Sequence, residues 1–549
     1  MTAGMDRRAF LGRAAAGAVG LMLLGRVPRG LGLPARTLAA DVAFTQGVAA
    51  GEPTANGITL WTHLDGLEAA ADLTLEVSAD PGFGSVLAAA PATARPEDGG
   101  SVHARVDDAR LQPGEQYYYR FAARAADSPV GRFRTARPPD SREPVRIAFF
   151  SCQDFIAGFY GAHADLAARD DVDLVVCLGD YVYERAFVGP DDRNPPVRED
   201  ATAPDGEAQT LDEYRRKYAL YHGDENLLAV RRQHAIAAVW DDHEVEDNYG
   251  DGSPGGATRN RRIPFAERRA NSYRAFFEAM PRGRLPEEVD RIYGSLSLGA
   301  AEVFLLDTRQ YRDPQACGNA GALGLPCLSP DVHSPARTLL GAAQKAWLKE
   351  ALVRSPAAWR IVANQVMMMS LDAVPRVPLN VDSWDGYAAE RRELIDHIGA
   401  SGVQDVAFIT GDIHTFFAGN VTRTGRQLLR GSPLPLVDGP ARATEFVGGA
   451  ISSPGLVDRL ATTESERVGV GGVLDLALTL ANQQLAYANQ AYKGYAVLEA
   501  GPDELAVEFR AVRDARIPGS PSFTLRRFRV ARGVPLVEDL GGPPRLIRS

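Results

Sequence analysis

The sequence predicts an α/β fold, with a large α/β domain preceded by a small β-sandwich. Between residues 44 and 136, short segments alternate polar and apolar residues and are separated by turn signals, a pattern typical of antiparallel strands. From Val145 onward, short apolar runs alternate with helical segments, a pattern typical of an α/β domain. Polar residues of metal-binding types follow several of these apolar runs directly.

The composition is that of an ordinary soluble globular protein. The chain has 549 residues, of which 45% are hydrophobic and 24% are charged. The net charge of −10 argues against non-specific nucleic-acid binding, because such binding requires a basic surface. A local basic pocket for a phosphate is still compatible with this charge.

Residues 1–40 are predicted to be a twin-arginine signal peptide. Arg7 and Arg8 precede an apolar stretch over residues 14–24, which is too short to span a bilayer. A basic start followed by a short apolar region is an export signal, and the arginine pair indicates the twin-arginine route. We therefore expect a mature protein that is periplasmic or secreted and has no transmembrane segment.

Residues 44–136 are predicted to form the sandwich domain. Strand patterns occur at 72–77, 101–106 and 116–124, and the turns DPGFG, PEDGG and LQPGEQ separate them. Such spacing over about a hundred residues is typical of an immunoglobulin or fibronectin III sandwich. The Pro-rich stretch RPPDSREP, residues 137–144, is predicted to be a linker.

Residues 145–520 are predicted to form the α/β domain. A helix is expected over 210–222, where Thr210 and Glu213 have the spacing of a capping box, and another over 344–354. The last fifteen residues are expected to be an irregular tail. The predicted strands are 145–150, 172–178, 235–240, 301–306, 359–364, 404–410 and 494–499.

The four cysteines are too few for a disulfide scaffold. Cys317 and Cys327 flank a Gly- and Pro-containing loop and could pair in an exported protein. Cys177 lies inside the apolar run VVCL and is expected in the core. Cys152 follows the run RIAFF, where a strand should open into a loop.

Side chains able to bind metals gather just after the predicted strands. In open α/β sheets, the carboxyl ends of the strands carry the ligand chemistry, so these clusters can converge at one edge. Carboxylates suit hard cations, imidazole suits zinc or iron, and thiolate and phenolate suit ferric iron or zinc. The candidates are Cys152; Asp180, Tyr181 and Tyr183; Asp241, Asp242, His243 and Asn248; Asn364 and Gln365; and Asp412 and His414.

Loops in the order GD, DHE and G-x-x-H resemble those of binuclear metallophosphoesterases. The chain resembles one branch specifically, the alkaline phosphatase D (PhoD) family, over nearly its whole length. This resemblance implies the metallophosphatase fold, in which two packed β-sheets are flanked by helices, with a PhoD N-terminal domain before it. The matching stretches are FFSCQD, LGDYVYE, VWDDHEVEDNY, LDTRQYR, LGAAQKAWLKEAL, VANQVMM, SWDGY and FITGDIHTFFAGN.

The resemblance also implies which residues bind metal. Asp180 would bridge two metals and act in catalysis. Cys152 as thiolate, Tyr183 as phenolate and His414 would complete a ferric iron site, Fe(3+). The second metal would be calcium, Ca(2+), bound by Asp242.

Other site residues are less fully determined by the resemblance. Asp412 would lie near the calcium. His243 matches a histidine that binds or protonates the phosphate in related enzymes. Asn364 stands where related enzymes have a histidine ligand, and Gln365 is an equal candidate. The final calcium contacts could come from Asp241, Glu244 or Asn248.

The implied mechanism is attack on phosphorus by a hydroxide or oxide that bridges the two metals. Arg309 could steady the substrate phosphate as an arginine fork. A structural ion pair of Arg309 with Asp307 or Asp313 is an equal alternative. A serine-hydrolase mechanism is disfavoured because the sequence contains no G-x-S-x-G elbow.

The expected function is that of an exported alkaline phosphatase and phosphodiesterase, a phosphoric ester hydrolase that scavenges phosphate. Its partners would be small phosphate esters, including phospholipid or nucleic-acid diesters, without stable nucleic-acid binding, and it would be a monomer. One alternative is a dedicated phosphodiesterase of phospholipase D or nuclease type in the same fold. Another is a non-catalytic surface-binding protein with a structural metal site, in which protein ligands fill the coordination sphere.

Overall fold

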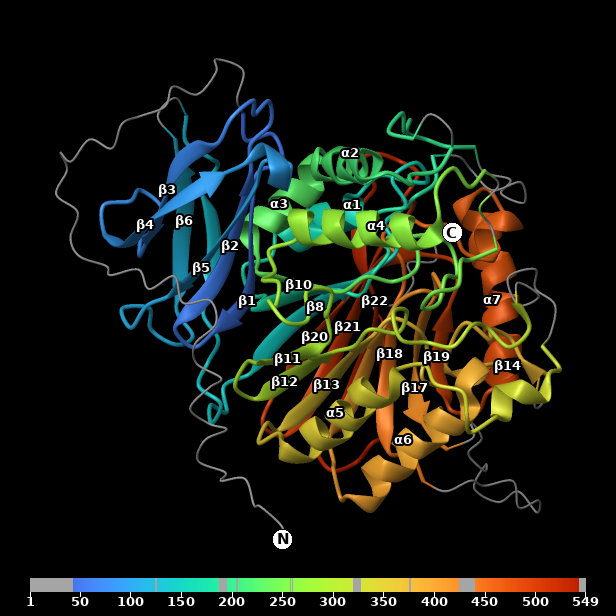
Figure 1. Ribbon diagram of the computed structural model, residues 1–549. Helices are drawn as coiled ribbons and strands as arrows, with labels where there is room; N and C mark the ends of the chain where they lie inside the picture. Colours follow the sequence, from blue (N-terminus) through green and yellow to red (C-terminus); the bar gives the residue numbers. More distant parts are fainter. Residues whose placement is uncertain are drawn as a thin grey trace, which may run out of the picture.

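The fold was analysed in a computed structural model (Figure 1). It describes residues 43–542 except 124–125, 187–194, 204–205, 257, 259, 319–326, 375–376 and 424–439. The predicted signal peptide, residues 1–40, lies outside the described residues. No helix in the described ranges is long and apolar enough to cross a membrane.

The N-terminal part is a β-sandwich, as the strand patterns predict. One sheet has the order β1-β2-β5 and the other has the order β4-β3-β6-β7. In β3, Leu73, Leu75 and Val77 are buried while Asp72 and Thr74 are exposed, so the apolar alternation faces the second sheet. The strands are β1 Val48–Thr54, β2 Gly57–His63, β3 Ala71–Ser78, β4 Val86–Ala94, β5 Ser101–Asp107, β6 Gln116–Ala122 and β7 Gly131–Arg134.

The sandwich packs against the helical side of the larger domain (Figure 1). The Trp61 indole nitrogen donates a hydrogen bond to the Glu278 carbonyl at 2.8 Å, and His103 Nε2 lies 2.8 Å from the Met280 carbonyl oxygen. Both carbonyls belong to the C-terminal end of α4 (Phe265–Ala279) and the residue after it. The sandwich is therefore fixed to the helix that precedes the first strand of the second large sheet.

The larger domain contains two seven-stranded sheets, which confirms the predicted fold class. The first has the order β10-β9-β8-β20-β21-β22-β23, and the second has the order β11-β12-β13-β16-β18-β17-β19. The first contains β8 Val145–Phe150, β9 Leu174–Cys177, β10 Ile236–Ala238, β20 Lys493–Ala500, β21 Glu504–Val512, β22 Ser522–Ala531 and β23 Glu538–Gly541. The second contains β11 Gly294–Ser297, β12 Ala301–Leu305, β13 Trp359–Asn364, β16 Val406–Thr410, β17 Phe416–Val421, β18 Ala443–Gly448 and β19 Leu485–Asn489.

Alternate residues of the second sheet face two different hydrophobic clusters. In β13, Ile361 and Ala363 belong to the cluster shared with the first sheet, whereas Val362 belongs to the cluster under the helices. In β16, Ala407 belongs to the cluster shared with the first sheet, and Phe408 belongs to the cluster under the helices. Both faces of each strand are buried, which explains why these strands are continuous apolar runs in the sequence.

Helices cover the outer faces of the two sheets (Figure 1). Helices α1 to α4 lie on the side of the first sheet, and α5 and α6 lie on the side of the second. The predicted capping box is present at α2, where the Thr210 side chain accepts from the Glu213 amide. Besides α4, the helices are α1 Gly161–Ala167, α2 Leu211–His222, α3 Glu225–Gln233, α5 Gly341–Arg354, α6 Ala388–Ala400 and α7 Glu464–Ala481.

The C-terminal part of the first sheet corrects one expectation. Strands β22 and β23 lie beyond residue 520 and continue the sheet after β21. The large domain therefore extends past the predicted end, and the stretch up to Gly541 is not an irregular tail. Cys317 and Cys327 form a disulfide.

The parallel strands place their carboxyl ends at one edge. In the first sheet, β8, β9 and β10 are parallel, and in the second sheet β12, β13, β16 and β18 are parallel. Loops after these strands carry the polar residues singled out in the sequence, so the topology brings the two sets together between the sheets.

Candidate metal centre

Four of the predicted metal ligands have a positive φ, which non-glycine residues rarely adopt. These are Cys152 (57°), Asp180 (54°), Asp412 (63°) and His414 (58°). Each lies in the turn that follows a central parallel strand. A left-handed conformation costs a non-glycine residue about 1–3 kcal/mol, and such strain concentrates at functional sites. The backbone is held in this form by the packed strands on either side.

The first ligand group joins three loops. Side-chain atoms of Cys152, Asp180 and His414 lie within 4.8 Å of one another. The Tyr183 hydroxyl donates a hydrogen bond to Asp180 Oδ2 at 2.9 Å and lies 3.4 Å from His414 Nε2. Cys152 and Tyr183 are fully buried. Thiol, carboxylate, phenol and imidazole therefore converge on one point.

Burial holds this group neutral in the protein without metal. Burial, followed by the charge of Asp180, raises the pKa of the Cys152 thiol well above its usual value. Burial, followed by the charge of Asp180, raises the pKa of the Tyr183 phenol in the same way. Burial lowers the pKa of His414 to about 3. His414 Nδ1 lies 2.8 Å from the Pro454 carbonyl oxygen and donates to it, so Nε2 is the ring nitrogen that faces the group.

The second ligand group shares Asp180 with the first. Ligand atoms of Asp180, Asp242 and His243 lie within 4.8 Å of one another. His243 Nδ1 is 2.8 Å from Glu184, and its ring stacks on Tyr183 with 4.1 Å between centroids. Burial opposes a charged carboxyl at Glu184, but His243 outweighs it and lowers the pKa of Glu184 to about 2. Glu184 therefore orients the imidazole.

The third ligand group shares Asp242 with the second. Carboxylate atoms of Asp241, Asp242 and Asp412 lie within 4.8 Å of one another. Burial raises the pKa of Asp241 to about 6 and, together with the charge of Asp241, raises the pKa of Asp412. Oδ2 of Asp241 is buried and has no hydrogen-bond partner among the described residues. A cation would satisfy this oxygen and offset the repulsion.

Arg309 lies among these carboxylates. Its Nε donates to Asp241 at 2.5 Å, and its two terminal nitrogens donate to the two oxygens of Asp382 at 3.0 and 2.6 Å. The expected partners, Asp307 and Asp313, are not those of its guanidinium. Its fork is filled by Asp382, so these contacts favour a structural ion pair over direct binding of the substrate phosphate.

Asp382 and Glu184 are site residues that the sequence did not single out. Asp382 lies in a loop just before the motif SWDGY and does not directly follow any strand that the sequence predicts. Glu184 follows the predicted ligand Tyr183 in the motif LGDYVYE. The position of Glu184 in that loop could have indicated its role, whereas no local sequence pattern indicates a role for Asp382.

Several sequence candidates have other contacts. The Asn364 carboxamide accepts from the Trp384 indole at 3.2 Å and donates to the Val366 carbonyl, and Gln365 accepts from the Thr308 hydroxyl at 3.0 Å. These contacts do not support either residue as a ligand, and the role of Asn364 stays a prediction.

Two residues of the acidic loop also serve the backbone. Glu244 accepts from the amides of Asp180, Tyr181 and Asp241 at 3.0, 2.7 and 2.8 Å, so it organises the loops that carry the ligands. The amide of Asn248 donates to Asp242 Oδ2 at 2.7 Å. Of the three candidates for the final calcium contacts, only Asp241 lies in a ligand group.

Two residues beside the site point away from it. The Tyr181 hydroxyl accepts from Arg231 at 3.1 Å, on the opposite side of the extended segment from Tyr183. Cys177 is buried within β9. Both offer matched controls for their neighbours.

The donor set fits two neighbouring cations of different kinds. Thiolate and phenolate are ligands of a ferric ion, whereas a purely carboxylate group suits a hard divalent cation. Asp180 joins the first group to the second, and Asp242 joins the second to the third. Shared carboxylates are what a pair of close cations requires.

Comparison with known proteins agrees with this arrangement. Residues 147–509 match the PhoD-like phosphatase family, and residues 32–137 match the PhoD-like phosphatase N-terminal domain. The chain is 32% identical over 506 residues to alkaline phosphatase D of Bacillus subtilis (strain 168), covering 88% of this chain and 80% of that protein.

Solved structures give the same result. A structure of PhoD has a TM-score of 0.80 and 28% identity, covering 92% of this chain and 94% of that one. The purple acid phosphatase PPD1 from yellow lupin (Lupinus luteus) seeds has a TM-score of 0.50 and 13% identity, covering 87% and 73%, and supports the fold alone. With both of its domains matched and its polar loops gathered at one edge of two packed sheets, the chain belongs to the PhoD-like phosphatase family.

Proposed function

We propose that this phosphoric ester hydrolase is a metal-dependent alkaline phosphatase that also cleaves phosphodiesters. The observation that carries the proposal is the chain of three ligand groups linked through Asp180 and Asp242. When bound, two close cations would activate water and bind phosphoryl oxygens. Family membership favours this enzyme over the non-catalytic surface-binding alternative.

The residues of the chain have distinct tasks in this reaction. Asp180 and Asp242, each shared between two ligand groups, would hold the cations. His243, oriented by Glu184 at 2.8 Å, donates a hydrogen bond to a phosphoryl oxygen or a proton to the leaving group. Arg309 keeps Asp241 and Asp382 in place through a buried ion pair.

The first group is proposed to bind Fe(3+) and the carboxylate groups to bind Ca(2+). The ligands of iron would be Cys152, Asp180, Tyr183 and His414. Those of calcium would be Asp242 with Asp412, and Asp241 is a further candidate. Binding of the iron would release protons, because burial raises the pKa of the Cys152 thiol and of the Tyr183 phenol.

The decisive experiment combines metal analysis with a visible absorption spectrum of the purified protein. We expect iron and calcium together, and a phenolate-to-iron charge-transfer band. Removing calcium with a chelator should abolish hydrolysis of p-nitrophenyl phosphate, and adding calcium should restore it. Full activity in a protein free of both ions would refute the proposal.

The relative rates on p-nitrophenyl phosphate and bis-p-nitrophenyl phosphate test the substrate class. Comparable rates would support the broad enzyme. Hydrolysis of the diester alone would support the dedicated phosphodiesterase instead. The same assay on a phospholipid and a nucleic-acid diester would identify the class of diester.

Export through the twin-arginine route is part of the proposal. Arg7 and Arg8 precede the short apolar stretch and support it. Changing both to lysine should retain the precursor in the cytoplasm. If the double variant reaches the medium or periplasm at the normal rate, the twin-arginine assignment is wrong.

A further inference from the structure

The segment 451–455, which follows β18, contacts every residue of the first ligand group except Asp180. The Ser452 and Ser453 amides donate to the Cys152 carbonyl at 3.4 and 3.2 Å. The Pro454 carbonyl accepts from His414 Nδ1 at 2.8 Å, and the Ser453 hydroxyl donates to the Tyr183 hydroxyl oxygen at 2.7 Å. One short loop therefore contacts the backbone of Cys152, the imidazole of His414 and the phenol of Tyr183.

The hydrogen bond from Ser453 has a fixed direction. Ser453 Oγ accepts from the Asp154 amide at 3.1 Å, and its single proton is directed to Tyr183 Oη. Tyr183 uses its own proton on Asp180 Oδ2 at 2.9 Å. A tyrosine that loses this proton keeps the donor from Ser453. Ser453 is fully buried, so water does not replace it.

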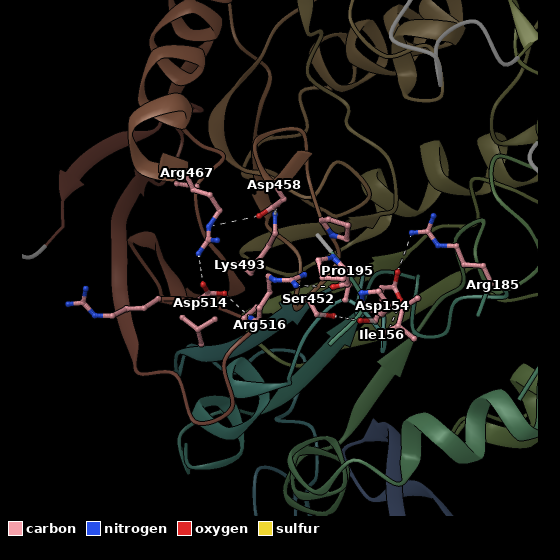
Figure 2. A pocket seen from close by; sticks show the side chains of 17 residues that line it. Asp154, Ile156, Arg185, Pro195, Ser452, Asp458, Arg467, Lys493, Asp514 and Arg516 are labelled. Carbon is pink, nitrogen blue, oxygen red and sulfur yellow. Dashed lines mark hydrogen bonds and ion pairs between the residues drawn. The ribbon is translucent and has the colours of Figure 1, made fainter. Parts of the chain in front are cut away.

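The segment is braced from outside by buried charges. Figure 2 shows the pocket beyond it, where Asp458, Lys493 and Arg467 lie together. Asp458 accepts from the Gly455 amide at 2.8 Å and pairs with Lys493 at 2.8 Å, and Lys493 also donates to the His414 carbonyl at 3.3 Å. Lys493 is paired with Asp458, and Arg467 is paired with Asp514 at 2.9 Å, so this side of the pocket supports the loop.

We propose that Ser453 is a positioning residue that fixes the Tyr183 oxygen for the metal through the hydrogen bond that its hydroxyl donates. The inference rests on the proposed function, because it assigns Tyr183 to the iron. A hydrogen bond donated to an anionic oxygen is about twice as strong as one between neutral groups. The loss of this donor should therefore raise the energy of the phenolate electrons without removing any ligand.

Ser452 provides a matched control next to Ser453 in the chain. Its hydroxyl is also buried, but it donates to the Asp154 carbonyl at 2.8 Å and does not contact Tyr183. Ser453→Ala and Ser452→Ala each remove one buried hydroxyl and its hydrogen bond from the same loop. Ser453→Thr retains a hydroxyl at the position and should rescue the effect.

The experiment compares the wild type with Ser453→Ala, Ser453→Thr and Ser452→Ala. In Ser453→Ala we expect full iron content, a charge-transfer band moved to longer wavelength, and kcat on p-nitrophenyl phosphate lower by roughly tenfold with little change in KM. Ser453→Thr and Ser452→Ala should keep the wild-type band and stay within about twofold of its kcat.

Identical bands and equal kcat values in the two alanine variants would overturn the role of Ser453. A wild type that is colourless and free of iron would instead contradict the proposed iron. In that case kcat of the active metal form still decides, because only Ser453→Ala should then lower it. Thermal unfolding shows whether Ser453→Ala still folds. If Ser453→Ala does not fold, Ser453→Thr decides: a folded Ser453→Thr whose charge-transfer band is also shifted would count against positioning through the hydroxyl.

Discussion

The two sides of the candidate metal centre differ in what compensates the burial of their polar groups. The thiol–phenol half, which consists of Cys152, Tyr183 and His414, is made of groups that burial keeps neutral. The carboxylate half, which consists of Asp241, Asp242 and Asp412, has an internal counter-ion. Arg309 lies 2.5 Å from Asp241 and 3.8 Å from the other two, and its charge opposes the effect of burial on their pKa values.

This difference agrees with the proposal of different cations for the two halves. Neutral donors become anionic only when a strongly polarising ion displaces their protons, which suits a trivalent ion. The carboxylates already have Arg309 as a counter-ion, so a cation of lower charge is enough to balance them. A divalent ion with oxygen ligands suits this half. Asp180 belongs to the first and second ligand groups and, among the residues that the structure describes, is the only carboxylate shared with the thiol–phenol half.

The largest effect is expected for Asp180→Asn. This change removes the carboxylate common to both groups, so neither cation is held at full strength. We expect a folded, colourless protein whose kcat/KM on p-nitrophenyl phosphate falls by at least about 1,000-fold, or about 4 kcal/mol.

The control for this change is Asp385→Asn. Asp385 is also a buried carboxylate, but it accepts from the Leu371 amide at 2.8 Å, outside the ligand groups. The Asp385→Asn protein should keep both metals and its activity. Retention of both ions in Asp180→Asn would remove the basis for a shared carboxylate.

The second largest effect is expected for Cys152→Ser, which should affect the thiol–phenol half alone. Cys152→Ser should lose iron, because a serine hydroxyl at a buried site is far harder to ionise than a thiol. Calcium should remain in the carboxylate half. Metal analysis should therefore show a selective loss, with activity reduced by roughly 100-fold, or about 2.7 kcal/mol.

Cys177→Ser is the matched comparison for the thiol. Cys177 is equally buried, but it lies within β9 and belongs to no ligand group. Full iron and full rate in Cys152→Ser would exclude the thiolate ligand, whereas loss of iron in both variants would indicate a general effect of disrupted packing.

Arg309→Lys tests the other half. Lysine keeps the positive charge but cannot bind both oxygens of Asp382, so the carboxylates should shift and repel one another more. Removing one side of a buried pair costs about 3–5 kcal/mol, and a conservative change should cost less. We expect weaker calcium binding and roughly tenfold lower activity that high calcium restores, with the colour unchanged.

Arg268→Lys gives the matched control. Arg268 is also fully buried, and its ion pair with Glu246 at 2.7 Å lies outside the three ligand groups. Both variants should lower the melting temperature, but only Arg309→Lys should change the calcium dependence. An equal calcium dependence in the two variants would assign Arg309 to stability alone.

The sequence singled out the residues of both halves but not Asp382, the carboxylate that pairs with the Arg309 fork. Cys152, Asp180 and His414 follow central strands whose buried faces give unmistakable apolar runs. Asp382 could not be found in this way, because it reaches Arg309 from a loop 73 residues further along the chain. Its role depends on tertiary placement alone.

The same limit applies to the fold. Strand β17, with the sequence FFAGNV, contains Gly and Asn, which are depleted in strands. Strand β18 contains Glu445, whose buried carboxylate accepts from the Met368 and Met369 amides. Strand β22 carries arginines on a partly exposed face. In each case pairing with neighbouring strands outweighs local composition, so a sequence pattern cannot reveal it.

The effect on rate expected for Tyr183→Phe is no larger than that for Arg309→Lys, and the colour is the main measurement. The ring stays stacked on His243 while the phenol oxygen, 2.9 Å from Asp180, is lost. A phenolate bound to ferric iron gives the charge-transfer band, so the purified variant should be bleached. Because Cys152, Asp180 and His414 remain, we expect iron to be retained in part and activity to fall by only about tenfold, or about 1.4 kcal/mol. Tyr181→Phe changes a neighbouring phenol that contacts Arg231 instead, and it should keep both colour and rate. A coloured Tyr183→Phe protein would show that the band arises elsewhere, and the thiol–phenol half would then hold its metal through sulfur, carboxylate and imidazole alone.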